Sequence, residues 1–343
     1  FFSGVFFSGV AMYMFVKELW GRAAGVMSSL FYLLVPYRAL DLYVRGALAE
    51  SLSFVWLPLI LWSIYKLYET QKSIYIFITS IFLALLMITH NLIFLPFMLL
   101  LPIYLLYLTV SSEKPKQFIV YCLWSIVYGF LLSAFFWIPA FFEKNYTIVD
   151  KMLLQNLADF RIHFVYPQQL WNWTWGFGGS ARGLADGISF KIGKLHIILS
   201  VFSLAFALIQ MMKQNKHFKF TAHSPQLTVL FFLLFVISAF MTTFYFLAIW
   251  ETIKPLAYLQ FPWRFLTFTA LFSSVLSGAF IYLLRLPILR LTVSVLLIFL
   301  LLANLKLFKP QNYRPSLTDE KATAHEVISW DVSKTSFEYI PKG

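Results

Sequence analysis

Residues 37–50 read YRALDLYVRGALAE and place two arginines and two acids between two apolar runs. The run before them, Ala23–Pro36, reaches only about 20 Å as a helix, and the run after them, Leu52–Tyr65, is equally short. The hydrocarbon core of a bilayer is about 30 Å thick. The two helices therefore either extend into the charged segment or leave it below the lipid headgroups. Charged side chains at that depth face a cavity or a partner rather than lipid.

The spacing within this segment predicts which side chains meet. On one helix, Tyr37, Asp41 and Arg45 share a face with Arg38 beside them, and Asp41 is placed to pair with Arg45. Gly46 is expected to break that helix. Glu50 then lies in the first turn of the next helix, where the helix dipole favours an acid. A salt-bridged helix end without any further role is the alternative interpretation, although ionisable groups inside a membrane are functional candidates by default.

The composition indicates a membrane protein. Of 343 residues, 60% are hydrophobic, 20% aromatic and 12% charged, which excludes an ordinary soluble domain. The predicted fold class is all-α, a polytopic transmembrane helix bundle. The net charge of +12 then indicates basic cytoplasmic loops rather than nucleic-acid binding. The single cysteine, Cys122, excludes an intrachain disulfide. The chain begins inside an apolar run and ends on a polar tail, so we expect it to be an internal fragment of a longer protein.

Hydropathy predicts about ten spans in a transmembrane domain over residues 1–306. They are Phe1–Val16, Ala23–Pro36, Leu52–Tyr65, Ile74–Thr89, Leu92–Val110, Phe118–Pro139, Ile192–Met212, Leu227–Ile249, Phe265–Leu284 and Ile288–Leu305. Residues 140–191 form a long loop, and residues 307–343 are expected to begin a soluble segment outside the membrane.

The distribution of Lys and Arg predicts the orientation in the cell membrane. Alternate loops are basic and contain few acids: Lys17, Arg22, Lys66, Lys72, Lys114, Lys116, Lys213, Lys216, Lys219, Arg285 and Arg290. These loops are expected to face the cytoplasm. The charged segment, the turn at His90 and Asn91, the long loop and the segment Trp250–Arg264 would then share the outer side.

Arginines on the predicted outer side suggest an anionic ligand, because a guanidinium binds phosphate with two parallel hydrogen bonds. The candidate substrate-binding residues are Tyr37, Arg38, Arg45, His90, Arg182 and Arg264. A lipid phosphate or diphosphate suits membrane-embedded arginines. Simpler interpretations remain: a hydrogen-bonded bundle histidine for His90, and an arginine that extends to the interface for Arg264. Trp171, Trp173 and Trp175 in the long loop are either membrane anchors or part of a lid over the site.

Asp41 and Glu50 are the candidate catalytic residues. A carboxylate near a bound phosphate can act as a general base on an acceptor hydroxyl, or it can hold a divalent cation. The sequence contains no phosphate-binding glycine loop, no zinc-ligand spacing and no nucleophile elbow. Neither a cofactor nor a metal is assigned by the sequence.

Several motifs resemble one family. They are the charged segment itself, Pro58, the sequence Thr89-His90-Asn91, Phe136-Trp137-Ile138-Pro139, Ser189-Phe190 with Gly193, and Gln260-Phe261-Pro262-Trp263-Arg264. Together they resemble bacterial membrane proteins labelled "6-pyruvoyl-tetrahydropterin synthase-related", over Gly21 to about Leu284. The six scattered histidines do not form the zinc site that a pterin synthase needs, so that activity is rejected.

The architecture is similar to that of the GT-C class of membrane glycosyltransferases, which use polyprenyl-phosphate sugars on the outer face. Their usual catalytic acid lies in the first outer loop, which would precede Phe1. The resemblance implies transfer of a sugar from such a lipid to an outer acceptor, with membrane lipids and the lipid-linked sugar as partners. The alternatives are a transporter or flippase of a lipid-linked glycan, and a non-catalytic envelope-assembly protein.

Overall fold

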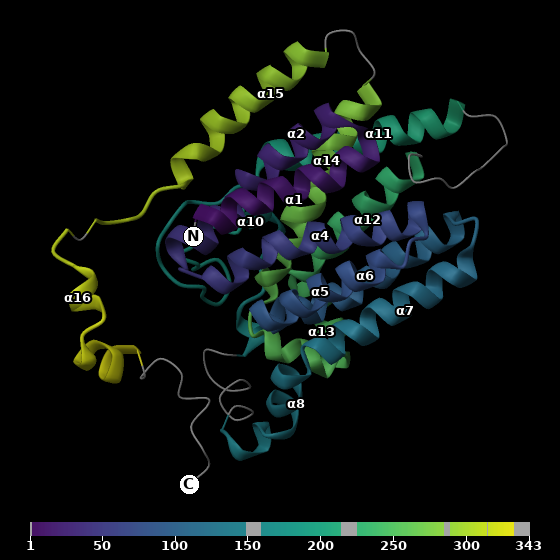
Figure 1. The fold of residues 1–343 in the computed structure, drawn as a ribbon. Helices are drawn as coiled ribbons and strands as arrows, with labels where there is room; N and C mark the ends of the chain where they lie inside the picture. The colour runs from purple at the N-terminus through teal and green to yellow at the C-terminus, as the bar shows by residue number, and fades with distance from the viewer. Residues whose placement is uncertain (1, 149–158, 214–224, 285–288, 314, 333–343) are drawn as a thin grey trace.

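The structure is a computed structural model, and it describes residues 2–148, 159–213, 225–284, 289–313 and 315–332. These residues form helices and connecting loops, and no β-strand occurs among them beyond one isolated bridge between Val165 and Thr243. The predicted all-α helix bundle is confirmed (Figure 1).

The helices of the bundle are α1 (Phe2–Trp20), α2 (Arg22–Leu33), α4 (Leu48–Thr70), α5 (Ile74–Thr89), α6 (Asn91–Ser111), α7 (Pro115–Leu132), α11 (Lys194–Lys213), α12 (Pro225–Met241), α14 (Leu266–Leu284) and α15 (Leu289–Asn304). Shorter elements connect them: α3 (Pro36–Ala39), the π-helix η1 (Leu40–Val44), α8 (Ala134–Phe142), α10 (Pro167–Trp171), α13 (Leu247–Thr252) and the 3₁₀-helix η7 (Pro262–Phe265).

Helix α14 lies at the centre of the bundle. Every residue of α14 except Tyr282 and Leu284 is buried, and it packs against α2, α11 and α12. Small residues in its second half permit this close approach, as in other membrane bundles. A side chain at Gly278 would bring its Cβ to 2.8 Å from the carbonyl oxygen of Ala24 in α2. Glycine at this position therefore sets the distance between the two helices.

Six helices are long and apolar enough to span a membrane, and a bent pair raises the number to seven, counted over the described residues. The pair is α2 with residues Pro36–Val44, which meet at an angle of 40°. Three further apolar helices are shorter: Ile74–Thr89, Pro225–Met241 and Leu291–Leu307. All ten predicted segments thus coincide with helices, but the count of ten spans stays a prediction.

Three predicted spans differ from the structure. The predicted span Leu227–Ile249 is divided, because α12 ends at Met241 and the 3₁₀-helix η5 (Phe244–Phe246) and α13 follow it. Helix α4 runs for 23 residues rather than stopping at the limits of its apolar run. It includes Glu50 near its beginning and Lys66 near its end, about 24 Å apart along the axis. The predicted span Phe118–Pro139 is instead divided at Ser133 between α7 and α8.

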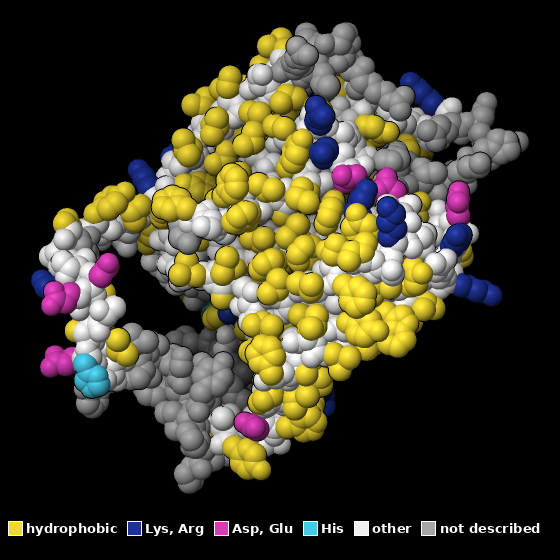
Figure 2. All heavy atoms as spheres, in the orientation of Figure 1, with side chains coloured by type: hydrophobic (Ala, Val, Ile, Leu, Met, Phe, Trp, Pro, Cys, Tyr) yellow, Lys and Arg dark blue, Asp and Glu magenta, His cyan; other side chains and the backbone are white. Residues whose placement is uncertain are grey.

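Polar contacts lie at both ends of α4. At its end, Lys66 pairs with Glu18 of α1 at 3.4 Å and also with Glu69. At its beginning, Glu50 contacts the charged segment described below. Figure 2 shows hydrophobic side chains over most of the visible face of the bundle, with many of the charged side chains toward the upper right of the view and others along its margins. This arrangement suits a bilayer-spanning body with polar ends.

Beyond α15 the chain leaves the bundle. The described part of this segment is largely exposed and includes the short helix α16 (Asp319–Ala322), which lies apart from the other helices in Figure 1. Lys216, Lys219 and Arg285, which were used to predict the orientation, lie outside the described residues, as do residues 333–343 of the predicted soluble segment.

Candidate functional site

The charged segment folds as a short helix followed by a wide turn. Pro36 occupies the first turn of α3, where its missing N–H has no cost. The chain then continues as η1, in which the Arg45 N–H bonds the Leu40 carbonyl at 2.9 Å, five residues back. Gly46 ends this turn with φ +62°, so the predicted helix break is confirmed. Single π turns of this kind are frequent at functional sites.

Six side chains meet beside this turn, and we call them the charged cluster: Tyr37, Asp41, Arg45, Glu50, His90 and Arg264. They come from α3, η1, the chain just after η1, the beginning of α4, the break between α5 and α6, and η7. All six were predicted from the sequence as candidate substrate-binding or catalytic residues. Their joint position at one end of the bundle is what one shared site requires.

Glu50 contacts more than one member of the charged cluster and so connects them. Its Oε1 accepts hydrogen bonds from the Tyr37 hydroxyl at 2.6 Å and from the Thr267 hydroxyl at 3.2 Å. Its Oε2 accepts a hydrogen bond from Arg45 Nη1 at 2.8 Å and lies 3.7 Å from Arg264 Nε. Thr267 was not predicted, although its place three residues after Arg264 on the next helical turn put it within reach of the same site.

Arg45 pairs with both acids of the cluster. The ion pair with Asp41, expected from their spacing, is present, and Glu50 is the second partner. The guanidinium also lies over the ring of Trp263, with its carbon 4.4 Å from the ring centre. All three of its hydrogen bonds use Nη1. Within the described part of the chain, Nε and Nη2 of Arg45 have no hydrogen-bond partner.

His90 faces the cluster as a neutral imidazole. Its Nδ1 accepts a hydrogen bond from the Ile93 N–H at 3.1 Å, which caps the beginning of α6. Nδ1 therefore carries no proton in this arrangement, and the ring's N–H is on Nε2, 4.0 Å from Glu50 Oε2. His90 is thus both a helix cap and a donor directed into the cluster.

The acidic side chains of the charged cluster are less exposed than the basic ones. The side chains of Asp41 and Glu50 are 0% exposed, whereas those of Arg45, Arg264 and His90 are 16%, 10% and 14% exposed. The carboxylates are therefore enclosed, whereas part of each basic side chain stays accessible. The Nε of Arg264 is itself buried and has no hydrogen-bond partner among the described residues.

Arg38 lies apart from the charged cluster. It is completely buried between the rings of Tyr32 and Phe54, at 5.0 and 4.3 Å from the guanidinium carbon to the ring centres. Its Nε donates to the Tyr32 carbonyl at 3.1 Å, and both terminal nitrogens have no partner among the described residues. Arg38 is enclosed in this structure, where it packs α3 against α2 and α4, and its role in substrate binding stays a prediction.

Arg182 is exposed in the long loop, and no hydrogen bond or ion pair joins it to the charged cluster within the described ranges. Other residues of that loop do approach the cluster. Phe190 packs on Trp263, with ring centres 5.6 Å apart, and His163 packs on Phe261 at 4.6 Å. The described part of the loop therefore contacts the segment that carries Arg264, and the lid over the site stays a prediction.

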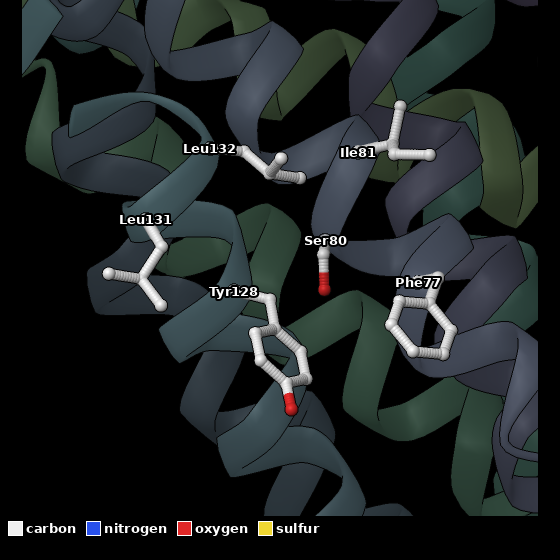
Figure 3. A pocket seen from close by; sticks show the side chains of 6 residues that line it. All are labelled: Phe77, Ser80, Ile81, Tyr128, Leu131 and Leu132. Carbon is white, nitrogen blue, oxygen red and sulfur yellow. The ribbon is translucent and has the colours of Figure 1, made fainter. Parts of the chain in front are cut away.

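No group of three or more His, Cys, Asp or Glu side chains that could hold a metal is found among the residues described. Asp41 and Glu50 are already neutralised by arginine. A groove of about 360 Å³ lies elsewhere, between α5 and α7 (Figure 3). Its lining is mainly apolar: Phe77, Ser80, Ile81, Tyr128, Leu131 and Leu132. The groove includes no member of the charged cluster and faces the apolar surface of the bundle.

Fold and site together define a multi-helix membrane protein with a buried charged cluster at one end of its bundle. The comparisons with known proteins give the family. Residues 3–310 match the model of the 6-pyruvoyl-tetrahydropterin synthase related domain, described as a membrane protein, and the chain belongs to that family. No curated protein and no solved structure gave a match.

Proposed function

We infer that the charged cluster binds the phosphate of a polyprenyl-phosphate sugar on the outer face of the cell membrane, and that the protein is a GT-C-like glycosyltransferase. The observation that supports this proposal is the difference in exposure: the two acids are enclosed, whereas the side chains of Arg45, Arg264 and His90 stay partly exposed. Arg45 offers Nε and Nη2 as a pair, the geometry that bidentate phosphate binding needs.

In this function the arginines bind the phosphate, and the acids position the arginines. Arg45 and Arg264 would contact the phosphate oxygens, and His90 would donate from Nε2. Asp41 and Glu50 are fully buried and ion-paired, so they are better placed to orient Arg45 than to remove a proton from an acceptor. The catalytic base is therefore left to a residue outside the charged cluster.

The test is binding and transfer with purified protein and a labelled polyprenyl-phosphate sugar. Arg45→Gln and Arg264→Gln should each weaken donor binding by about tenfold to a hundredfold, the scale of one charge-assisted hydrogen bond. Arg161→Gln is the matched control, because Arg161 is exposed and pairs with Asp159 and Glu251 away from the cluster. Equal donor affinity in all three variants would refute the phosphate site.

One feature favours the second candidate, a transporter or flippase of a lipid-linked glycan. The span that carries the charged cluster is interrupted between Leu33 and Pro36 and bends by 40°, and broken helices are typical of transporter binding sites. Reconstitution into vesicles separates the two functions. Movement of the labelled lipid between leaflets without release of sugar would support the transporter, and sugar transfer without such movement would support the enzyme.

A further inference from the structure

A second group of cations lies outside the charged cluster, where Lys191 is close enough to Lys194 and Lys306 for their charges to act on it. Lys191 precedes α11, Lys194 is its first residue, and Lys306 follows α15. Over the part of the chain that the structure describes, none of the three forms an ion pair or a hydrogen bond with an acid. Three neighbouring cations without an acid repel one another, so the group is more stable with an anion bound.

Two of these lysines lie beside tryptophans. The Lys191 ammonium lies 5.6 Å from the ring centre of Trp175, and the Lys194 ammonium lies 5.8 Å from that of Trp171. Lys191 is half-buried, and burial, together with the charges of Lys306 and Lys194, lowers its pKa. Tryptophans in this number are typical of the region where lipid headgroups meet the acyl chains.

An exposed apolar stripe leads away from the lysines along each helix. On α11 the exposed side chains Ile198, Val201, Leu208 and Met212 follow Lys194 at intervals that keep them on one face. On α15 the exposed side chains Leu291, Val295, Ile298 and Leu302 precede Lys306 with the same periodicity. The opposite faces of both helices pack together with α2 and α14. Figures 1 and 2 show α15 at the margin of the bundle, with hydrophobic side chains outward.

We propose that Lys191, Lys194 and Lys306, with Trp171 and Trp175, form a binding site for the phosphate of an anionic membrane lipid, whose chains lie along the exposed stripes of α11 and α15. A lipid fits better than a free anion, because the cationic group is continuous with apolar surface that water would cover poorly. Isolated lysines at helix ends can simply extend to the interface, but three that converge without an acid hold a localised positive charge.

This site is separate from the phosphate site of the proposed function, although the two are neighbours. Phe190, next to Lys191, packs on Trp263, and Trp263 in turn contacts Arg45. Tyr43 of the charged segment contacts Phe308, two residues after Lys306. An anionic lipid bound to the lysines would thus hold the end of α15 and the loop before α11 against the charged segment.

The experiment measures lipid binding to purified protein by native mass spectrometry. The probes are phosphatidylglycerol, which is anionic, and phosphatidylcholine, which has no net charge. Replacing the three lysines by glutamine should weaken phosphatidylglycerol binding by about tenfold to a hundredfold, since each basic residue near an anionic surface contributes several-fold. Phosphatidylcholine binding should not change. Replacing the same lysines by arginine should preserve phosphatidylglycerol binding, and it controls for misfolding of the glutamine variant.

The matched control removes the same charge at the other end of the bundle: Lys72→Gln, Lys114→Gln and Lys116→Gln, three exposed residues. It should bind phosphatidylglycerol as the unmodified protein does. Equal losses in both triple variants, or equal binding of the two lipids by the unmodified protein, would overturn the proposal. Complete displacement of the lipid by excess inorganic phosphate would assign the lysines to a free anion instead.

Discussion

Arg264 is the residue at which two interpretations of a membrane arginine can be separated. Its Nε lies 3.7 Å from Glu50, and its Nη1 donates to the Leu259 carbonyl, so its stem does not simply extend toward water. A guanidinium provides two parallel donors, whereas lysine provides a point charge on a similar stem.

Arg264→Lys should therefore bind the polyprenyl-phosphate sugar almost as weakly as Arg264→Ala does. The physical reason is that lysine retains attraction to Glu50 but cannot bond the Leu259 carbonyl from Nη1 and still present the Nη2 donors of a guanidinium to a phosphate. The measurement is donor affinity of the two variants beside that of the unmodified protein. If Arg264→Lys binds with full affinity while Arg264→Ala does not, a point charge suffices and the bidentate role is wrong.

Arg45 offers a test of whether the cluster is a binding site or only an architectural feature. Arg45→Gln leaves two buried carboxylates, Asp41 and Glu50, without their main partner. Breaking a buried pair costs about 3–5 kcal/mol, which predicts a clear loss of thermal stability. Adding Asp41→Asn removes one excess charge, and Arg264 remains close to Glu50, so the double variant should recover stability.

The double variant should recover stability without recovering affinity for the polyprenyl-phosphate sugar, because the Nε and Nη2 groups of Arg45 are still missing. The loss expected is about tenfold to a hundredfold. A double variant that is stable and also binds donor with unmodified affinity would show that the cluster only supports the fold, and the phosphate proposal would be withdrawn.

At the scale of the elements, the sequence predicted the parts of the charged segment better than their assembly. The spacing of Asp41 and Arg45, the break at Gly46 and the place of Glu50 in a first helical turn follow from local rules. The contacts of Glu50 with His90, Arg264 and Thr267 depend on how distant helices pack, and no local pattern specifies that. Arg38 was predicted as a binding residue because spacing cannot distinguish a guanidinium sandwiched between rings from one that faces a cavity.

The packing of α14 on α2 gives a prediction at the same scale. Gly278→Ala places a methyl group 2.8 Å from the carbonyl oxygen of Ala24, which is backbone and cannot turn aside. The two helices must separate, and overpacking of this kind costs about 1–3 kcal/mol. The melting temperature of the purified variant should fall. Gly179→Ala is the control, since no atom lies within 4 Å of its added methyl group and the melting temperature should not change.

For the whole molecule, hydropathy located every helix of the bundle but not which of them span. Helices α5 and α12 have only 16 and 17 residues, so length does not decide whether they cross the membrane fully. The predicted orientation of the protein in the membrane rests on the positive-inside rule. That rule describes how a chain is inserted, and the fold alone does not show which end faces the cytoplasm. The two polar layers at the ends of α4 define the two sides of the molecule, and the question is which of them faces the cytoplasm.

Cysteine labelling in intact cells determines which end of the bundle faces the cytoplasm. In a Cys122→Ser background, Ser73→Cys and Thr174→Cys place exposed thiols near Lys72 and in the long loop, respectively. Because Lys66, Lys72, Lys114 and Lys116 lie in or beside the connections predicted to face the cytoplasm, Ser73→Cys should resist an impermeant thiol reagent until the cells are permeabilised. Thr174→Cys should react at once. Cys122 is buried in α7, so its replacement by serine controls for background labelling. The reverse pattern would place the charged cluster on the cytoplasmic side, and a donor phosphate at the outer face could then not reach Arg45 and Arg264.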